Sequence, residues 1–268
     1  MNRSILAISK KIPILLIFLF ITLPLFMVLW ISFFSQQLII FPPKGYSLEW
    51  YKALGEQTQF LDSFLLSLKV SVTATVFSII LGLFSSIAIV RYNFWGKKIL
   101  EMLFLSPLIV PSIITGIAIY IYLFNLERMS NMNLVPSYWS LVIAHIIIAL
   151  PWTVRLISAG LQSISPSLEE ASIDLGSTKV QAFYNIVLPN LRPSIIAAAI
   201  LSFIHSFNNL EISLMLVSPG ETTLPIEILN YVTWRINPLI AAVSTVQILL
   251  IAILMWIANR FVKVTNMI

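Results

Sequence analysis

Apolar residues in this chain gather into six long blocks that are separated by shorter polar segments. A membrane-spanning helix needs about 20 consecutive apolar residues, and each block is long enough for one. Strands of a membrane barrel would instead alternate apolar and polar positions over about ten residues. The pattern predicts an all-α, polytopic membrane protein with six transmembrane helices in a single domain, residues 1–268. The blocks cover residues 12–34, 64–90, 99–124, 138–157, 195–217 and 239–261.

The composition supports this class of protein. Charged residues make up 10% of the 268 positions, and the mean hydropathy is +0.95. A soluble domain has about 25% charged residues. The chain has no cysteine and two histidines, so disulfides and thiolate metal sites are excluded, and we expect no metal and no cofactor. The net charge of +5 is attributed to basic residues in cytoplasmic loops and not to a surface that binds nucleic acid.

The distribution of lysine and arginine predicts the orientation. With the N-terminus inside, basic residues are concentrated in the inner segments, which indicates that both termini are cytoplasmic. The first block follows two lysines, as in a signal peptide, but it is longer than a cleavable apolar core and no small-x-small site follows it, so we expect a retained helix. The inner segments hold Arg3, Lys10, Lys11, Arg91, Lys97, Lys98, Arg155, Lys179, Arg192, Arg260 and Lys263, and the outer ones hold Lys44, Lys52, Arg128 and Arg235.

A polar segment, about residues 158–192, lies between the fourth and fifth blocks. Its three carboxylates and its prolines make a seventh membrane span costly. It is predicted to form two short helices: the first begins at Ser165-Pro166, Gly176 ends it with positive φ, and Pro189 ends the second. Such a segment can be an interfacial loop under the bundle, or a surface on which another protein docks.

The spacing within this segment resembles a known family motif. It reads Glu170-Ala171-Ser172, three residues, Gly176, nine residues, Ile186, one residue, Leu188-Pro189. This resembles the EAA loop of ABC-importer permeases, Glu-Ala-Ala-x3-Gly-x9-Ile-x-Leu-Pro, with Ser172 in place of the second alanine. The resemblance extends over residues 12–262 to permeases with the MetI-like fold. Stretches closest to the spermidine/putrescine permeases are His145 to Pro151 with Arg155, Ser202-Phe203, and Asn208 to Glu211.

The resemblance implies that the polar segment is a coupling loop that docks on a cytoplasmic ATPase. Leu168, Ala171 and Leu175 would make apolar contacts, Glu170 would pair with a basic group, and Gly176 would supply the bend. The partners implied are a second permease subunit, expected to be a different chain, two ATPase subunits and an extracytoplasmic solute-binding protein. The full set of predicted coupling residues is Leu168, Glu169, Glu170, Ala171, Ser172, Leu175, Gly176, Ile186, Leu188 and Pro189.

The predicted translocation path uses polar residues of the fifth and third blocks. On a continuous helix, His205, Asn208, Asn209 and Glu211 fall within an arc of roughly 160°, and Ser112 and Thr115 come from the third block, whose prolines are expected to kink it. An intramembrane carboxylate suits a cationic solute. The alternative is structural: Glu211 would pair with Lys69 or His145, and the asparagines would join helices by hydrogen bonds.

The combined prediction is a permease subunit in a bacterial inner membrane that forms half of the pathway for a small solute, a polyamine or similar organic cation. Importers of iron(III), phosphonate or betaine-type osmolytes remain alternatives, as does an ion-gradient-driven secondary transporter. The chain lacks a Gly-x4-Gly-Lys-Ser/Thr phosphate loop, so it is not itself expected to be an enzyme, and ATP hydrolysis would belong to a partner. The hydrolase motifs Gly-x-Ser-x-Gly and His-Glu-x-x-His are also absent.

Overall fold

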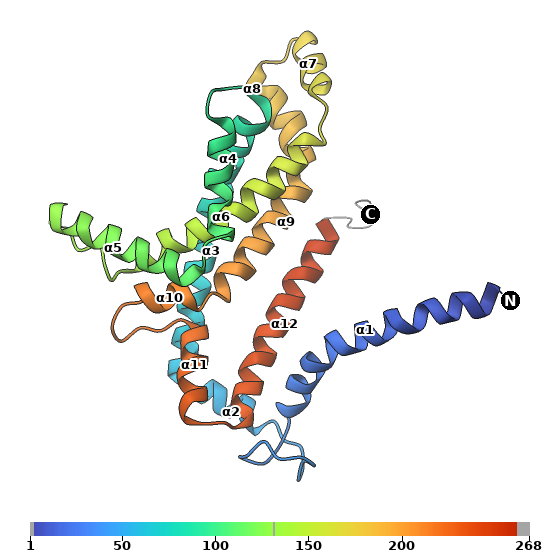
Figure 1. Ribbon diagram of the computed structural model, residues 1–268, viewed down its shortest axis with the longest axis vertical. Coiled ribbons are helices and arrows are strands. Elements are labelled where there is room, and N and C mark those ends of the chain that lie inside the picture. Colours follow the sequence, from blue (N-terminus) through green and yellow to red (C-terminus); the bar gives the residue numbers. More distant parts are fainter. Residues whose placement is uncertain (1–2, 131, 262–268) are drawn as a thin grey trace. The chain divides into compact units, whose positions relative to one another are not determined.

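The computed structural model describes residues 3–130 and 132–261, and helices dominate this part of the chain (Figure 1). The only β-pairing within it is an isolated bridge between Phe34 and Tyr46. The predicted all-α class is confirmed. The helices are α1 (Arg3–Ile31), α2 (Glu49–Glu56), α3 (Thr58–Arg91), α4 (Lys97–Leu105), η1 (Ser106–Leu108), α5 (Ser112–Ser130), α6 (Tyr138–Gln162), α7 (Pro166–Asp174), α8 (Lys179–Ala182), η2 (Phe183–Val187), α9 (Leu188–Phe207), α10 (Glu211–Leu216), α11 (Leu224–Trp234) and α12 (Pro238–Phe261).

Five helical stretches among the described residues are long and apolar enough to cross a membrane, and a sixth span results if α4–η1 and α5 are counted together. That pair is bent by 109°, so the third block is a broken span and not one continuous helix. The break contains Pro107 and Pro111. Proline lacks a backbone N–H and disfavours helical backbone in the residue before it. The expected effect of the prolines is therefore confirmed, but it is much larger than a kink.

The chain divides into two compact units, which we describe separately. The smaller combines residues up to 60 with residues 228–250. In it, the Trp50 indole N–H donates to the Phe34 carbonyl at 2.6 Å, and the hydroxyls of Ser32 and Tyr51 are 2.7 Å apart. These bonds fasten α2 to the segment that follows α1. Of the described residues, the larger unit combines 61–130, 132–227 and 251–261, and it contains the polar loop and the path residues.

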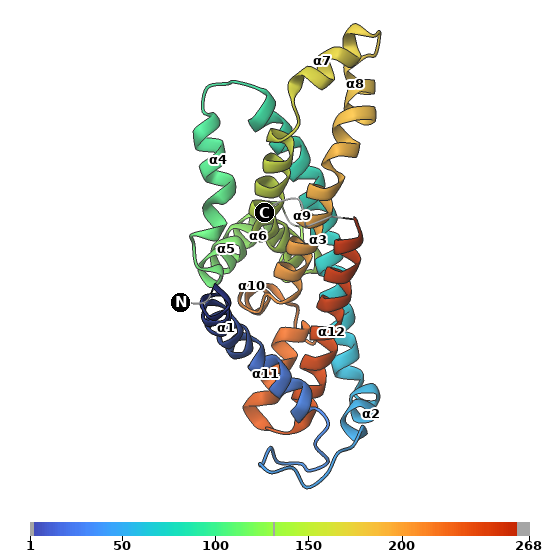
Figure 2. The ribbon, with the colours of Figure 1, turned by 90° about the vertical axis from the view of Figure 1, so that its right-hand side faces the viewer.

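Within the larger unit, α3 and α6 run in the same direction and α9 runs in the opposite one (Figure 2). The hydroxyls of Ser78 and Ser86 on α3 donate to the carbonyls of Ile146 and Val154 on α6, at 3.3 and 3.1 Å. Both pairs are 68 residues apart in sequence, which is the register of parallel helices. These directions agree with the predicted alternation of spans two, four and five. The cytoplasmic side stays a prediction, and Lys263 lies outside the described residues.

Small residues allow α6 to approach both neighbours closely. A Cβ added at Gly82 of α3 would lie 2.7 Å from the Cβ of Thr153, and one added at Gly160 would lie 2.6 Å from the Cβ of Ser194 on α9. Both distances are far shorter than a van der Waals contact. The tight packing fixes α3, α6 and α9 as one layer, which carries the polar loop at one end.

Candidate functional site

The first helix of the polar loop, α7, forms where the sequence predicts it. Pro166 is its first residue, and Ser165 precedes it with extended backbone, although the Ser165 hydroxyl bonds the Ser167 hydroxyl and not a backbone N–H. The helix ends at Gly176, whose φ is +97°. The N–H groups of Gly176 and Ser177 donate to the carbonyls of Ile173 and Ser172, at 2.9 and 3.1 Å. This is the Schellman arrangement, and it confirms the predicted helix stop.

The second part of the loop differs from the prediction. The hydroxyl of Thr178 caps α8 together with Gln181, and the chain then passes through the π-helical turn η2 into α9 without a break (Figure 1). The predicted end at Pro189 is wrong. Pro189 lies in the first turn of α9. The π-helical turn before it changes the hydrogen-bonding register of the backbone. Pro189 therefore occupies a position at a helix start, where the absence of its N–H costs little stability.

Nine of the ten predicted coupling residues fall into two groups in the structure. No residue of α7 is buried, and Leu168 and Leu175 expose 50% and 89% of their surface. Glu170 and Ala171 are also exposed, and Ser172 is half-buried. By contrast, Ile186, Leu188 and Pro189 are half-buried where the chain re-enters the helix layer. We call Leu168, Glu170, Ala171 and Leu175 the α7 surface.

Glu169 belongs to neither group, because it faces the helix layer. Its carboxylate forms an ion pair with Arg91, the last residue of α3. The same guanidinium nitrogen, Nη2, also donates to the carbonyl of Ile164 at 3.3 Å. Beside this pair, apolar side chains from the ends of α3, α6 and α9 form a cluster whose buried members are Leu161, Ile164, Val187 and Leu191. Sequence reasoning placed Glu169 on the docking face and missed Arg91.

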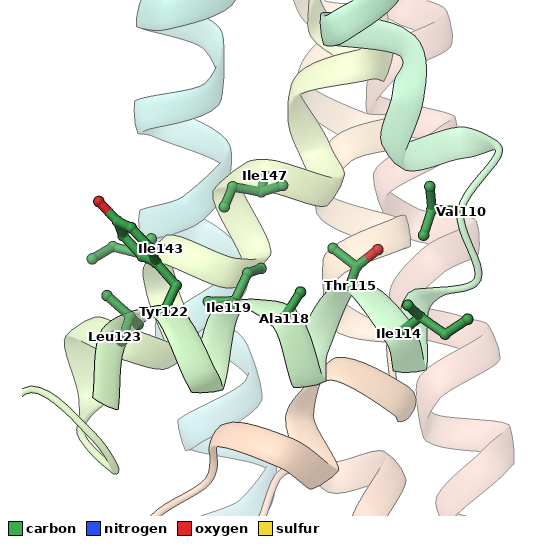
Figure 3. A pocket seen from close by; sticks show the side chains of 9 residues that line it. All are labelled: Val110, Ile114, Thr115, Ala118, Ile119, Tyr122, Leu123, Ile143 and Ile147. Atoms are coloured by element: carbon green, nitrogen blue, oxygen red, sulfur yellow. The ribbon is translucent and has the colours of Figure 1, made fainter. Parts of the chain in front are cut away.

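The predicted path residues gather around one pocket of about 480 Å³ in the larger unit. Only Thr115 does not line it. Figure 3 shows Thr115 among apolar side chains of α5 and α6, in a second pocket of about 370 Å³. The structure therefore brings together five of the six residues proposed for the path. The polar pocket is lined by Ser112, Ile204, His205, Asn208, Asn209, Leu210 and Glu211.

The fifth span is not a continuous helix at this pocket, so the predicted 160° arc is wrong. Helix α9 ends at Phe207 and α10 begins at Glu211. The Asn208 side-chain N–H donates to the Ile204 carbonyl at 3.0 Å, and the Asn209 side-chain oxygen accepts the Ile212 N–H at 3.0 Å. Asparagine side chains compete in this way with helical hydrogen bonds. The break itself turns the polar residues toward the pocket.

His145 of α6 lies beside this break and joins its two sides. Its Nδ1 is 2.8 Å from the Ser206 hydroxyl, and its Nε2 is 3.1 Å from the Ser213 hydroxyl. The Ser213 hydroxyl donates its proton to the Asn209 carbonyl at 2.8 Å. Nε2 must then carry the hydrogen that it donates to Ser213, and Nδ1 accepts from Ser206.

The alternative partners suggested for Glu211 are not found in the described residues. His145 is occupied by the two serines, and the ion pair found in this part of the chain is that of Arg91 with Glu169. Glu211 is exposed at the pocket. The side chains of Asn208 and Asn209 bond the backbone of Ile204 and Ile212. Glu211 forms no ion pair among the described residues, and the other ionisable side chain that lines the pocket is His205.

Comparison with known proteins identifies the family. Residues 74–265 match the family described as binding-protein-dependent transport system inner membrane component. The chain belongs to this family. It is 30% identical over 259 residues to the putrescine transport system permease protein PotI of Escherichia coli K12, covering 96% of this chain and 92% of PotI. It is thus an inner-membrane permease subunit of an ABC importer, as the EAA-like loop implies.

Two further relatives widen the range of solutes. The spermidine/putrescine permease PotC of Escherichia coli K12 is 26% identical over 219 residues, covering 82% of this chain and 80% of PotC. PhnV of Salmonella paratyphi A, which carries the name of a 2-aminoethylphosphonate transport system, is 29% identical over 260 residues, covering 97% of this chain and 95% of PhnV. The names cover both cationic and phosphonate solutes.

Solved structures support the fold. A chain of a bacterial ABC transporter for the polysaccharide alginate matches with a TM-score of 0.75 at 17% identity, covering 96% of this chain and 95% of that one. A chain of the methionine transporter MetNI matches with a TM-score of 0.62 at 17% identity, covering 78% and 97%. These similarities extend to the fold alone.

Proposed function

We propose that this permease subunit forms half of a translocation pathway for a polyamine or a similar small organic cation. The observation that carries the proposal is the polar pocket at the break in the fifth span. The described residues that line it include one carboxylate, Glu211, two amides and the imidazole of His205, but no lysine or arginine. A carboxylate in a membrane protein attracts a cation and repels an anion. The names of PotI and PotC support the same class of solute.

The phosphonate alternative is supported by the similarity to PhnV. A phosphonate group is anionic and is commonly bound by lysine or arginine, and neither residue type lines this pocket. Instead, the pocket presents Glu211. The charge of the pocket therefore favours the cation.

The remaining subunits follow from the surfaces that this chain leaves exposed. We propose that two ATPases dock in the assembled importer, one on the α7 surface of each permease, and that the second permease is a different chain. One solved relative is a bacterial alginate transporter in complex with a periplasmic protein that holds an alginate pentasaccharide. By analogy, we propose that an extracytoplasmic binding protein delivers the solute.

The test of the solute is uptake into liposomes that contain the complete importer, with radiolabelled putrescine, spermidine and 2-aminoethylphosphonate compared. We expect uptake of a polyamine, and we expect Glu211→Gln to reduce it about tenfold, because the variant removes a charge-assisted contact. Glu221→Gln, which removes an exposed carboxylate from the segment after α10, is the matched control and should transport normally. Preferred uptake of the phosphonate, or an unchanged Glu211→Gln variant, would overturn the proposal.

A further inference from the structure

We propose that Arg91 passes movement of α7 directly to α3, and that α3 acts as a rigid rod between the coupling loop and the segment around the polar pocket. The inference rests on the proposed coupling role of α7. It adds a positioning residue that lies outside the EAA-like motif, and it assigns a mechanical part to the second span.

The first observation is how little holds α7. The helix buries none of its residues, and its covalent ends lead to α6 and α8. Among residues 3–130 and 132–261, the pair between Arg91 and Glu169 is the only ion pair or side-chain hydrogen bond that joins α7 to a spanning helix. A force applied to the α7 surface therefore reaches α3 through this pair, whereas it reaches α6 through the backbone.

The second observation is that Arg91 fixes two points of the loop. Its Nη2 donates both to the carboxylate of Glu169 on α7 and to the carbonyl of Ile164 at the end of α6. The Arg91 Nε is buried and has no hydrogen-bond partner among the described residues. A partly buried guanidinium depends strongly on the acceptors that it does have. One side chain thus links the end of α3 by hydrogen bonds both to α7 and to the residue pair that follows α6.

The third observation is the continuity of α3. It has 34 residues and contains no proline, whereas α6 contains Pro151 and α9 contains Pro193 and follows the π-helical turn. Residues 61–91 alone span about 45 Å at 1.5 Å per residue. A continuous helix transmits an axial displacement, while the broken and kinked spans can bend. Of the long helices that meet the coupling loop, α3 alone has neither a proline nor an adjoining π-helical turn in the described part of the chain.

The fourth observation is what α3 holds at its other end. The Ser67 hydroxyl accepts the backbone N–H of Leu224 at 2.8 Å, and the Ser63 hydroxyl lies 2.6 Å from that of Thr222. Val70 packs in one buried cluster with Ile212 of α10. These contacts attach α3 to α10 and to the segment that follows it. Since α10 begins with Glu211, a shift of α3 reaches the polar pocket.

The experiment measures transport and ATP hydrolysis together, in proteoliposomes that contain the complete importer. The readout is the number of solute molecules taken up for each ATP hydrolysed. For Arg91→Gln we expect this ratio to fall about fivefold or more, the scale of a coupling change, while the complex assembles and hydrolyses ATP. Glu169→Gln should behave alike. The double variant Arg91→Glu with Glu169→Arg should recover much of the ratio, because it restores the ion pair.

Two controls separate transmission from folding. Lys98→Gln removes an exposed positive charge near the same end of α3 and should leave the ratio unchanged. Ser67→Ala removes the acceptor for Leu224 at the far end of α3 and should lower the ratio as Arg91→Gln does. If Arg91→Gln lowers only the amount of assembled complex and leaves the number of solute molecules per ATP unchanged, the ion pair of Arg91 with Glu169 only stabilises the fold. The proposal is then wrong.

A cross-link distinguishes this proposal from the coupling role on which it rests. Leu175→Cys should be linked by a short thiol-reactive reagent to the ATPase subunit in both the Arg91 and the Arg91→Gln backgrounds. If the cross-link is absent in both, the docking role of α7 fails. If the cross-link forms in both and the ratio is unchanged, docking stands and transmission through Arg91 is refuted.

Discussion

Replacing His145 by phenylalanine tests whether this side chain holds the break in the fifth span. The ring is 2% exposed, and both of its nitrogens bond serines that are themselves buried, Ser206 and Ser213. Phenylalanine keeps an aromatic ring of similar size but offers no donor and no acceptor. The substitution therefore removes the hydrogen bonds while changing the packing little.

The size of the effect follows from a chain of three hydrogen bonds, which join Ser206 to His145, His145 to Ser213, and Ser213 to the Asn209 carbonyl. Ser213 keeps its acceptor, the Asn209 carbonyl, whereas Ser206 is left as a buried hydroxyl, 1% exposed, without the acceptor Nδ1. Two lost bonds at about 1 kcal/mol each, with an unsatisfied hydroxyl added, give a destabilisation of about 2–4 kcal/mol. For a chain of this size that is a fall in melting temperature of about 5–10 °C.

The assays are thermal unfolding of the purified importer and uptake in proteoliposomes. His145→Gln is the informative partner variant, because an amide can accept from Ser206 and donate to Ser213, and it should recover both readouts in part. Ser202→Ala removes a weaker bond, 3.4 Å, between the same two helices and should cost less than about 1 kcal/mol. A phenylalanine variant that melts and transports like the unmodified protein would refute the assignment of His145.

Substitutions at Gly160, Gly176 and Leu175 test the packing and the coupling loop. Gly160→Ala should destabilise the chain by about 1–3 kcal/mol through overpacking, and Ser194→Gly should restore thermal stability by making room. Gly176→Val should block uptake with normal membrane insertion, because valine disfavours positive φ, and Gly176→Asn should be tolerated; uptake relative to protein in the membrane measures both. Leu175→Asp should leave the melting temperature unchanged, since this side chain is 89% exposed, but should abolish co-purification of the ATPase.

The spans and the start and stop of α7 could be predicted because local signals determine them. Apolar blocks of membrane length form helices wherever the chain enters lipid. Proline at a first helical position and glycine with positive φ act through their own backbones, so Pro166 and Gly176 have the predicted roles without reference to the rest of the fold. At such positions the local sequence alone is sufficient to predict the backbone conformation.

The errors occur where the effect of a residue depends on its neighbours in space. Pro189 was expected to end a helix, but the π-helical turn before it places it at a helix start. Glu169 and Glu170 are adjacent and chemically alike, yet one pairs with Arg91 and the other is exposed. The position of α3 beside the loop determines which of the two carboxylates can reach Arg91. The residues of the motif do not contain that information.

The two broken spans explain why a polar pocket exists in so apolar a chain. Ser112 is the first residue of α5, just after the break in the third span, and residues 208–210 form the break in the fifth; both line the same pocket. Non-helical backbone at membrane depth is tolerated where it is enclosed by protein or lines a cavity. Helix α9 ends, and helices α5 and α10 begin, at this pocket, so helix ends of both signs meet there beside the carboxylate of Glu211. The breaks thus bring helix ends as well as polar side chains to one pocket, which six uninterrupted helices could not do.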